Sequence, residues 1–248
     1  MIQLDTVHKS FGSNAVLQGV TLEIPRGESM VIIGGSGTGK SVMLKSVLGL
    51  IQPDSGAIHV DGQNVLEVDR DAFLARFGML FQGGALFDSL TVWQNVAFRL
   101  LRGPLKRPKD EARDIAIDKL RRVGLTADVA DKFPGELSGG MQKRVGLARA
   151  IAAEPEIIFF DEPTTGLDPI MAGVINDLIR EIVVEMGATA MTITHDMSSV
   201  RAIADKVAML HQGVIQWTGP IAQMDVTDNA YVQQFINGRA TGPIEAVR

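Results

Sequence analysis

A glycine-rich segment near the start of the chain has the residue types and spacing of a phosphate-binding loop. An apolar run at residues 30–33 precedes the segment Gly-Gly-Ser-Gly-Thr-Gly-Lys-Ser, and the helix-forming residues 42–50 follow it. Glycines let the backbone wrap closely around phosphate oxygens, and the start of a helix adds positive potential there. An ordinary glycine-rich turn with a solvated lysine is the alternative, which this strand and helix context disfavours. The residues expected to contact the ligand are Gly34, Gly35, Ser36, Gly37, Thr38, Gly39, Lys40, Ser41 and Val42.

Two carboxylates stand where the chemistry of a bound triphosphate would need them. Asp161 and Glu162 follow the apolar residues 157–160, at the carboxyl end of an expected strand, where open α/β sheets bind ligands. Asp161 is suited to hold Mg²⁺ through water, together with the Ser41 hydroxyl, while Lys40 would neutralise the β- and γ-phosphates. Glu162 is placed to orient or deprotonate the attacking water. Capping of the next helix is the alternative role for this acidic pair.

A second phosphate-binding surface is expected at Ser138, Gly139 and Gly140. These residues precede the helix-forming residues 141–153, so they present a helix N-terminus suited to an anion. A helix cap without a ligand is the alternative. One γ-phosphate is not expected to need both this surface and the phosphate loop from the same chain.

The elements that must position these residues follow an α/β pattern. Short apolar runs alternate with amphipathic ones, as in a parallel sheet covered by helices. Residues 2–7 and 19–24 predict an N-terminal antiparallel β subdomain, with a turn at 11–14, and a helical subdomain is expected at about 85–153 within a domain spanning 1–236. The remaining strands are expected at residues 188–193, 206–210 and 214–218. Residues 237–248 are expected to form a tail, as a loop or ordered by a partner.

Composition narrows the classes of function. The chain has 248 residues, 46% of them hydrophobic, which is enough for a substantial core. A formal charge of −5 argues against a broad affinity for nucleic acid. The chain has no cysteine, so disulfides and thiol catalysis are excluded. No secretory signal is visible, and the apolar runs fall far short of the roughly 20 residues that span a bilayer, so a membrane role is expected to come through partners.

Together with the two earlier motifs, the segment Leu-Ser-Gly-Gly-Met-Gln at 137–142 resembles the signature of ABC ATPases. The resemblance covers about residues 2–236 and implies ATP hydrolysis with Mg²⁺ in a homodimer, where the signature meets ATP held by the other subunit. Met141 departs from the more common glutamine at the fifth position of the signature, which puts a contact from that position in doubt.

Four further positions match this family singly. Gln82 resembles the Q-loop glutamine, which contacts Mg²⁺ or water, and His195 resembles the switch histidine at the γ-phosphate. Asp168 resembles the D-loop aspartate between the two sites, with a helix cap as an alternative or additional role. Phe11 lies where the family places an aromatic ring against adenine, with a hydrophobic turn anchor as its alternative.

The stretch 81–98 is similar to the Mla-type ATPases of MCE-associated phospholipid transporters. That similarity implies permease subunits, an MCE-domain lipid-binding protein, a small STAS-domain subunit and a peripheral location on the cytoplasmic face of the inner membrane. An apolar groove for a permease helix is expected from these residues, with Phe87 and Trp93 as its exposed anchors: Leu86, Phe87, Leu90, Val92, Trp93 and Phe98.

Other classes of function remain as alternatives. An ABC-type ATPase of DNA repair would separate its motifs by long coiled coils, and one of translation would carry two cassettes, whereas here one set spans about 160 residues. A third interpretation is an ATPase that regulates envelope machinery without moving cargo.

Overall fold

The computed structural model describes residues 2–245 and divides the chain into two compact units. The first unit comprises Met1–Val68 and Met191–Arg248, and the second comprises Asp69–Ala190. Strand β8 (Thr189–Ile193) spans the boundary in the sequence. Residues 246–248, which belong to the expected tail, lie outside the described residues.

The first unit contains the predicted antiparallel sheet. Its strands are β1 (Ile2–Phe11), β2 (Asn14–Ile24), β4 (Ser55–Val60) and β5 (Gln63–Asn64), in the order β2-β1-β4-β5. On β1 the side chains of Ile2, Leu4 and Val7 are buried, and a register shift between Leu4 and Val7 interrupts the alternation. The strands are longer than the sequence predicts, so the turn between β1 and β2 contains two residues, Gly12 and Ser13.

A second set of strands in this unit carries the phosphate loop. Strand β3 (Ser29–Ile33) pairs in parallel with β9 (Lys206–His211), which pairs antiparallel with β10 (Val214–Pro220). Every residue of β3 is buried, which is typical of a parallel strand covered on both faces. The helices of the unit are α1 (Lys40–Val47), α7 (Met197–Ile203), α8 (Ile221–Met224) and α9 (Ala230–Ile236).

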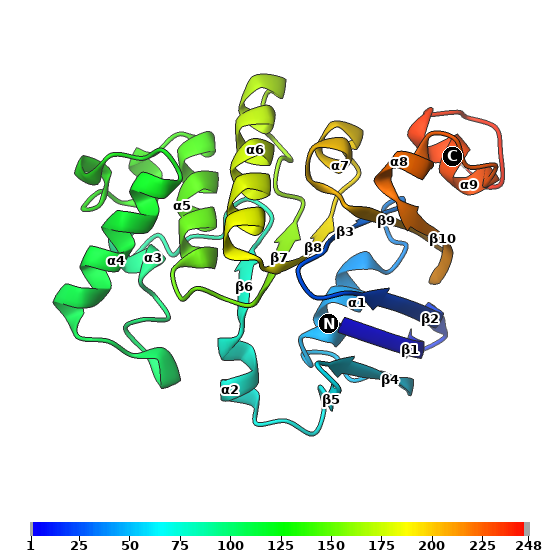
Figure 1. The fold of residues 1–248 in the computed structure, drawn as a ribbon, viewed down its shortest axis with the longest axis horizontal. Helices are drawn as coiled ribbons and strands as arrows, with labels where there is room; N and C mark the ends of the chain where they lie inside the picture. The colour runs from blue at the N-terminus through cyan, green and yellow to red at the C-terminus, as the bar shows by residue number, and fades with distance from the viewer. Residues whose placement is uncertain (1, 246–248) are drawn as a thin grey trace. The chain divides into compact units, whose positions relative to one another are not determined.

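The second unit is mostly helical. Its parallel strands are β6 (Phe77–Leu80) and β7 (Ile157–Asp161). Helices α3 (Val92–Val96), α4 (Lys109–Arg122) and α5 (Gly139–Ile151) pack against one another, and all three are drawn in green or blue-green in Figure 1. The helices of this unit are α2 (Arg70–Ala75), α3 (Val92–Val96), α4 (Lys109–Arg122), α5 (Gly139–Ile151) and α6 (Pro169–Met186), with short 3₁₀ turns η1 (Gly103–Leu105), η2 (Ala127–Val129) and η3 (Pro134–Glu136).

The described part of the tail is held by one glutamine. Residues 237–245 contain no helix or strand. The buried Gln234 of α9 donates to the Arg239 and Ile244 carbonyls at 3.2 and 2.9 Å, and its side-chain oxygen accepts from the Ile244 N–H at 2.7 Å. The described segment is therefore anchored within its own chain.

One predicted surface residue is wrong. Trp93 was expected to be an exposed anchor, but it is 5% exposed in α3, and Val92 is fully buried. The start of α4 explains the difference, because Lys109 and Arg113 lie 5.9 and 5.7 Å from the Trp93 ring centroid. Phe87 is 44% exposed, as expected, and stacks on Phe98 with ring centroids 4.5 Å apart. Within residues 2–245, no helix has the length and apolar character needed to cross a membrane.

Candidate functional site

The phosphate loop joins β3 to α1 and has a backbone that glycine alone fits at two positions. Gly34 has φ 152°, and an added Cβ would lie 2.2 Å from the Leu210 carbonyl oxygen on β9. Gly39, the residue before α1, has φ 103°, and its Cβ would lie 2.8 Å from the Val16 carbonyl oxygen. A side chain at either position would force the loop away from its neighbours, so the tight turn requires glycine.

The Lys40 side chain folds back onto the backbone of the phosphate loop. Its Nζ donates to the carbonyls of Gly34 and Gly35 at 2.8 and 2.7 Å, and the side chain of Thr38 donates to Gly35 at 3.0 Å. Lys40 itself is buried, whereas Ser36, Gly37 and Ser41 are exposed and Val42 is half-buried. A buried ammonium above an exposed glycine turn is an arrangement that suits an anion.

His195 follows β8 in the same unit and lies next to the strand that carries the phosphate loop. The Thr194 N–H donates to the Ile32 carbonyl at 3.3 Å, so the His195 turn begins beside β3. Asp196 fixes this turn by accepting hydrogen bonds from Ser198 and Ser199, whose hydroxyls lie 2.7 Å from its carboxylate. Burial raises the pKa of Asp196, but these hydrogen bonds outweigh that effect and hold it below its ordinary value. The imidazole of His195 is exposed at the surface of the unit.

Phe11 ends β1, also in the first unit. Its ring is 49% exposed, and the Lys9 Nζ lies 5.5 Å from the ring centroid. The first unit thus contains Phe11, the phosphate loop and His195. The loop and the His195 turn follow β3 and β8, which are neighbouring strands.

The acidic turn belongs to the second unit. Asp161 is the last residue of β7, and Glu162 adopts φ 48°, a left-handed conformation that is uncommon for a residue with a side chain. The Glu162 carboxylate accepts from the Thr165 hydroxyl at 3.0 Å, and its carbonyl accepts from the Thr165 N–H at 3.3 Å. Both Asp161 and Glu162 are half-buried. These contacts fix the direction of the Glu162 side chain.

The signature residues stand at the start of α5 in this unit. Ser138 is the N-cap and accepts from the Met141 N–H at 3.3 Å, while Ser138 and Gly139 are exposed. Gly140 is close to another helix, because an added Cβ would lie 2.9 Å from the Met171 side chain. Gln142 donates to the Pro134 and Leu137 carbonyls at 3.0 and 3.3 Å, so it stabilises the segment that precedes α5.

Gln82 lies in an exposed loop after β6 that α5 supports from within the second unit. The Arg149 guanidinium donates to the Gly84 and Ala85 carbonyls at 2.7 and 2.8 Å. Burial lowers the pKa of Arg149, although a guanidinium keeps its charge in proteins. Arg149 therefore ties the Gln82 loop to α5.

Asp168 is the N-cap of α6. Its carboxylate accepts from the Ile170 and Met171 N–H groups at 3.0 Å each, and Pro169 takes the first helical position. The capping role proposed for this residue from its sequence is thus present.

Sequence reasoning missed Lys143 and Arg149 of α5. Each is a cation on α5. Lys143 lies four residues before Leu147, so both are on the buried face of this helix. A positive charge at an i, i+4 position of an apolar stripe is the signal that could have found Lys143.

Comparisons with known proteins agree with this geometry. A family profile described as ABC transporter matches residues 17–165. The probable ribonucleotide transport ATP-binding protein mkl of Mycobacterium leprae is 44% identical over 246 residues, covering 98% of this chain and 70% of that protein. Protein TRIGALACTOSYLDIACYLGLYCEROL 3, chloroplastic, of Arabidopsis thaliana is 39% identical over 262 residues, covering 98% and 75%. The methionine import ATP-binding protein MetN of Brucella abortus is 39% identical over 253 residues, covering 100% and 67%.

Solved structures share the fold. The dimeric post-hydrolysis state of the ATP-binding cassette MJ0796, bound to ADP and Pi, has a TM-score of 0.80 at 32% identity, covering 89% of this chain and 99% of that one. The cbiO1 protein of Clostridium perfringens has a TM-score of 0.81 at 30% identity, covering 96% and 94%. With a profile match over more than half of its length and relatives at 39–44% identity along nearly all of it, the chain belongs to the ABC transporter family and is an ATPase.

Proposed function

We propose that the chain is the ATP-hydrolysing subunit of an ABC transporter that moves phospholipid or a related lipid between membranes of the cell envelope. Two copies would hold ATP between the phosphate loop of one and the signature of the other. The observation that carries the ATPase role is the phosphate loop, in which the buried Lys40 ammonium donates to the Gly34 and Gly35 carbonyls and in which positions 34 and 39 require glycine.

The proposed roles follow from the surroundings of each side chain. Lys40 binds the β- and γ-phosphates, and the Phe11 ring stacks on adenine. Ser138 and Gly139 offer an exposed helix start to the phosphates of the partner's ATP. Glu162 accepts the proton of the attacking water, and His195 donates to the γ-phosphate. Gln82 and Asp168 lie in loops that would report nucleotide state to the permease and to the second site.

The donor set fits Mg²⁺. Ser41 offers an exposed hydroxyl, Gln82 an exposed amide and Asp161 a half-buried carboxylate, and hard oxygen donors are the ligands that Mg²⁺ takes. Among residues 2–245 no group of three or more His, Cys, Asp and Glu side chains forms a metal cage. This fits an ion held by few protein ligands plus substrate phosphates. When bound, Mg²⁺ would neutralise charge on the transferred phosphoryl group.

Lipid as the cargo class is supported by similarity. The stretch 81–98 resembles Mla-type ATPases, and the name of the Arabidopsis relative contains trigalactosyldiacylglycerol. The other relatives bear names that refer to ribonucleotide and methionine transport. An MCE-domain lipid-binding protein and a small STAS-domain subunit are the accessory partners we propose, at the cytoplasmic face of the inner membrane.

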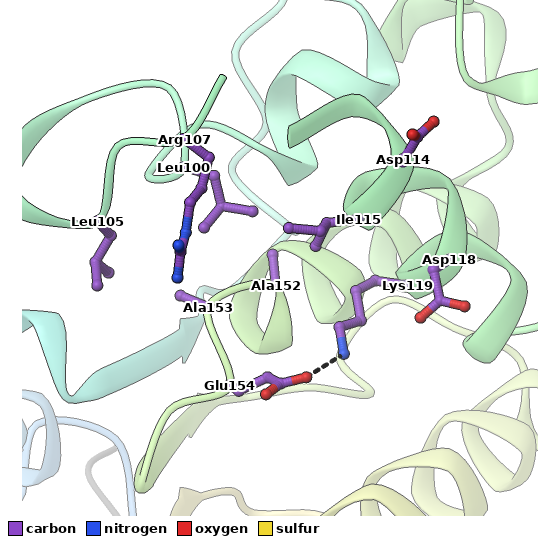
Figure 2. A pocket seen from close by; sticks show the side chains of 10 residues that line it. All are labelled: Leu100, Leu105, Arg107, Asp114, Ile115, Asp118, Lys119, Ala152, Ala153 and Glu154. Carbon is purple, nitrogen blue, oxygen red and sulfur yellow. Dashed lines mark hydrogen bonds and ion pairs between the residues drawn. The ribbon is translucent and has the colours of Figure 1, made fainter. Parts of the chain in front are cut away.

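A pocket in the second unit is the site we propose for a permease segment. Leu100, Ile115 and Ala152 are among the residues that line a cavity of about 450 Å³, and Figure 2 shows their side chains. Lys119 and Glu154, which also line it, form an ion pair at 3.0 Å. A pocket lined by both apolar and charged side chains suits an amphipathic helix, whose apolar side would contact the apolar residues. The stacked Phe87 and Phe98 rings provide a second apolar contact in this unit.

Purification of the tagged full chain from its native membranes tests the function. Mass spectrometry would identify the associated proteins and lipids, and Ile115→Asp would be compared with Val226→Asp, a change at a residue that is 76% exposed. We expect a permease, an MCE-domain protein and phospholipid with the unchanged chain and with Val226→Asp, and loss of the permease with Ile115→Asp. A permease of another class would contradict the lipid cargo, and nucleic acid or ribosomes in its place would contradict transport.

A further inference from the structure

A buried lysine lies behind the acidic turn of the second unit. Lys143 is the fifth residue of α5 and is 4% exposed. Its Nζ donates a hydrogen bond to the Glu162 carbonyl oxygen at 3.3 Å. Removing an ammonium from water costs several kcal/mol unless partners compensate it, and lysine is almost never fully buried without them. The turn after β7 supplies those partners.

The charges around Lys143 explain why a cation is tolerated there. Burial lowers the pKa of Lys143, whereas the negative charges of Glu162 and Asp161 raise it. The ammonium thus lies in the field of both carboxylates that the proposed reaction uses, in addition to its contact with the backbone.

The contact falls on the one residue of this turn whose backbone is strained. Glu162 has φ 48°, and the left-handed conformation costs roughly 1–2 kcal/mol for a residue with a Cβ. Its carbonyl accepts from both the Lys143 Nζ and the Thr165 N–H, at 3.3 Å each. Strained backbone persists where its surroundings enforce it, so Lys143 is one of the groups that hold Glu162 in this conformation.

The same lysine is close to the signature along α5. Ser138 caps the helix, and Lys143 lies little more than one turn further on. If a phosphate displaced the start of α5, Lys143 would move, and with it the hydrogen bond that Lys143 donates to the Glu162 carbonyl. In the proposed dimer, this contact would connect the surface that binds the partner's ATP to the carboxylate that acts on the chain's own ATP.

We propose that Lys143 is a positioning residue for hydrolysis, which holds the Glu162 peptide so that its carboxylate faces the attacking water and couples that carboxylate to the signature end of α5. The inference rests on the proposed role of Glu162. It predicts that loss of the Lys143 donor slows hydrolysis without weakening the binding of ATP.

The test compares Lys143→Met, which removes the donor and its charge, with Lys143→Arg, which keeps both. Lys206→Met is the control, because Lys206 forms an ion pair with Glu28 on the first unit, in a part of the chain with no proposed role in catalysis. Steady-state hydrolysis by the full chain with Mg–ATP should show kcat lowered roughly 10- to 100-fold by Lys143→Met, as expected for a misplaced catalytic group. KM and the Kd for ATP should change less than about twofold. Lys143→Arg should recover most of kcat, and Lys206→Met should match the unchanged chain.

A double variant separates positioning from plain stability. If Lys143 acts through Glu162, Lys143→Met added to Glu162→Gln should lower the residual rate little further, since the two effects are not additive. An unchanged kcat for Lys143→Met would overturn the inference, as would equal losses of kcat, ATP affinity and Tm in the Met and Arg variants. If the Met variant does not fold, Lys143→Gln takes its place in the same comparison. Full activity of Glu162→Gln would instead overturn the proposed role of Glu162 itself.

Discussion

At the residue scale, Lys40 and Glu162 divide the proposed reaction between binding and chemistry. Lys40 is buried against the phosphate loop and adds positive charge where the phosphates bind. Glu162 is held by Thr165 and Lys143 in a backbone conformation that aims its carboxylate. Substitution of Lys40 should therefore weaken ATP binding, whereas substitution of Glu162 should lower kcat.

Substitution of each residue tests this division. Lys40→Ala should abolish productive ATP binding, because the phosphate charge loses its counter-ion. Glu162→Gln should bind ATP with affinity near that of the unchanged chain and lose roughly 100-fold or more in kcat, as for removal of a general base. Equilibrium binding of a fluorescent ATP analogue and steady-state kinetics measure the two quantities. A fully active Glu162→Gln protein would show that another group activates the water.

Asp196, beside His195, links the stability of its turn to pH. Hydrogen bonds hold its pKa below the ordinary 3.8, so its contribution to the free energy of unfolding is present above pH 3.8 and is lost as pH falls through the lower folded value. Asp196→Ala should cost about 1 kcal/mol at neutral pH, as for other N-caps, and this difference should shrink below pH 3.8. Urea denaturation between neutral and acidic pH measures the effect. Asp228→Ala, at an exposed carboxylate, is the control, and a pH-independent loss for Asp196→Ala would contradict the account.

At the scale of elements, α5 is the scaffold of the second unit's functional residues. Ser138 caps its start, Lys143 contacts Glu162 one turn on, and Arg149 holds the Gln82 loop near its end. One rigid helix therefore fixes three segments that are far apart in the sequence. Figure 1 shows this helix between α4 and α6.

Removal of Arg149 should release the Gln82 loop. Arg149→Met deprives the Gly84 and Ala85 carbonyls of a charged donor, and hydrogen bonds to charged groups contribute about 1.5–3 kcal/mol. Hydrogen exchange should then be faster at residues 81–85, and the free energy of unfolding should fall by an amount in that range. Arg201→Met, which breaks an exposed ion pair with Asp225, should cost below about 1 kcal/mol and leave the loop protected. Unchanged exchange in Arg149→Met would show that the loop is held by other contacts.

Neighbouring glycines of the phosphate loop offer a matched pair. Gly34→Ala would place a Cβ 2.2 Å from the Leu210 carbonyl oxygen, whereas a Cβ at Gly35 would make an ordinary contact with the Thr38 side chain at 3.8 Å. We expect Gly34→Ala to lower the free energy of unfolding by about 2–3 kcal/mol, the upper part of the range for overpacked sites. Gly35→Ala should stay within about 1 kcal/mol of the unchanged chain. Thermal unfolding of both variants tests the difference, and equal stabilities would contradict the close approach of β9 to the loop.

These elements show which features of the fold and of the site can be predicted from the sequence. The phosphate loop, the acidic pair and the signature are local patterns, and the strands at β3, β7, β8, β9 and β10 lie within a residue or two of their predicted bounds. Continuous apolar runs mark buried parallel strands such as β3 and β7. Trp93 was misplaced because its burial depends on α4, which is distant in the sequence. Lys143 was missed for the same reason, because its partner at Glu162 is brought close only by the packing of α5.

At the scale of the whole molecule, the proposed assembly follows from chemistry on two surfaces. The phosphate loop and the start of α5 both suit phosphate, and the first is in one unit while the second is in the other. The related cassette MJ0796 was solved as a dimer bound to ADP and Pi. A homodimer of this chain would use both surfaces on each of two nucleotides, so ATP should stabilise the dimer by mass action.

The size of the Glu162→Gln protein with and without Mg–ATP tests this central claim most directly, because slow hydrolysis keeps both surfaces engaged. Size-exclusion chromatography with light scattering should show a monomer without nucleotide and with ADP, and a dimer with ATP. Ser138→Arg, which places a long side chain at the exposed helix start, should prevent the ATP-dependent shift while the Kd for ATP on the isolated chain stays within about twofold. An unchanged mass on addition of ATP, under conditions where ATP binding is measured, would contradict the two-chain site.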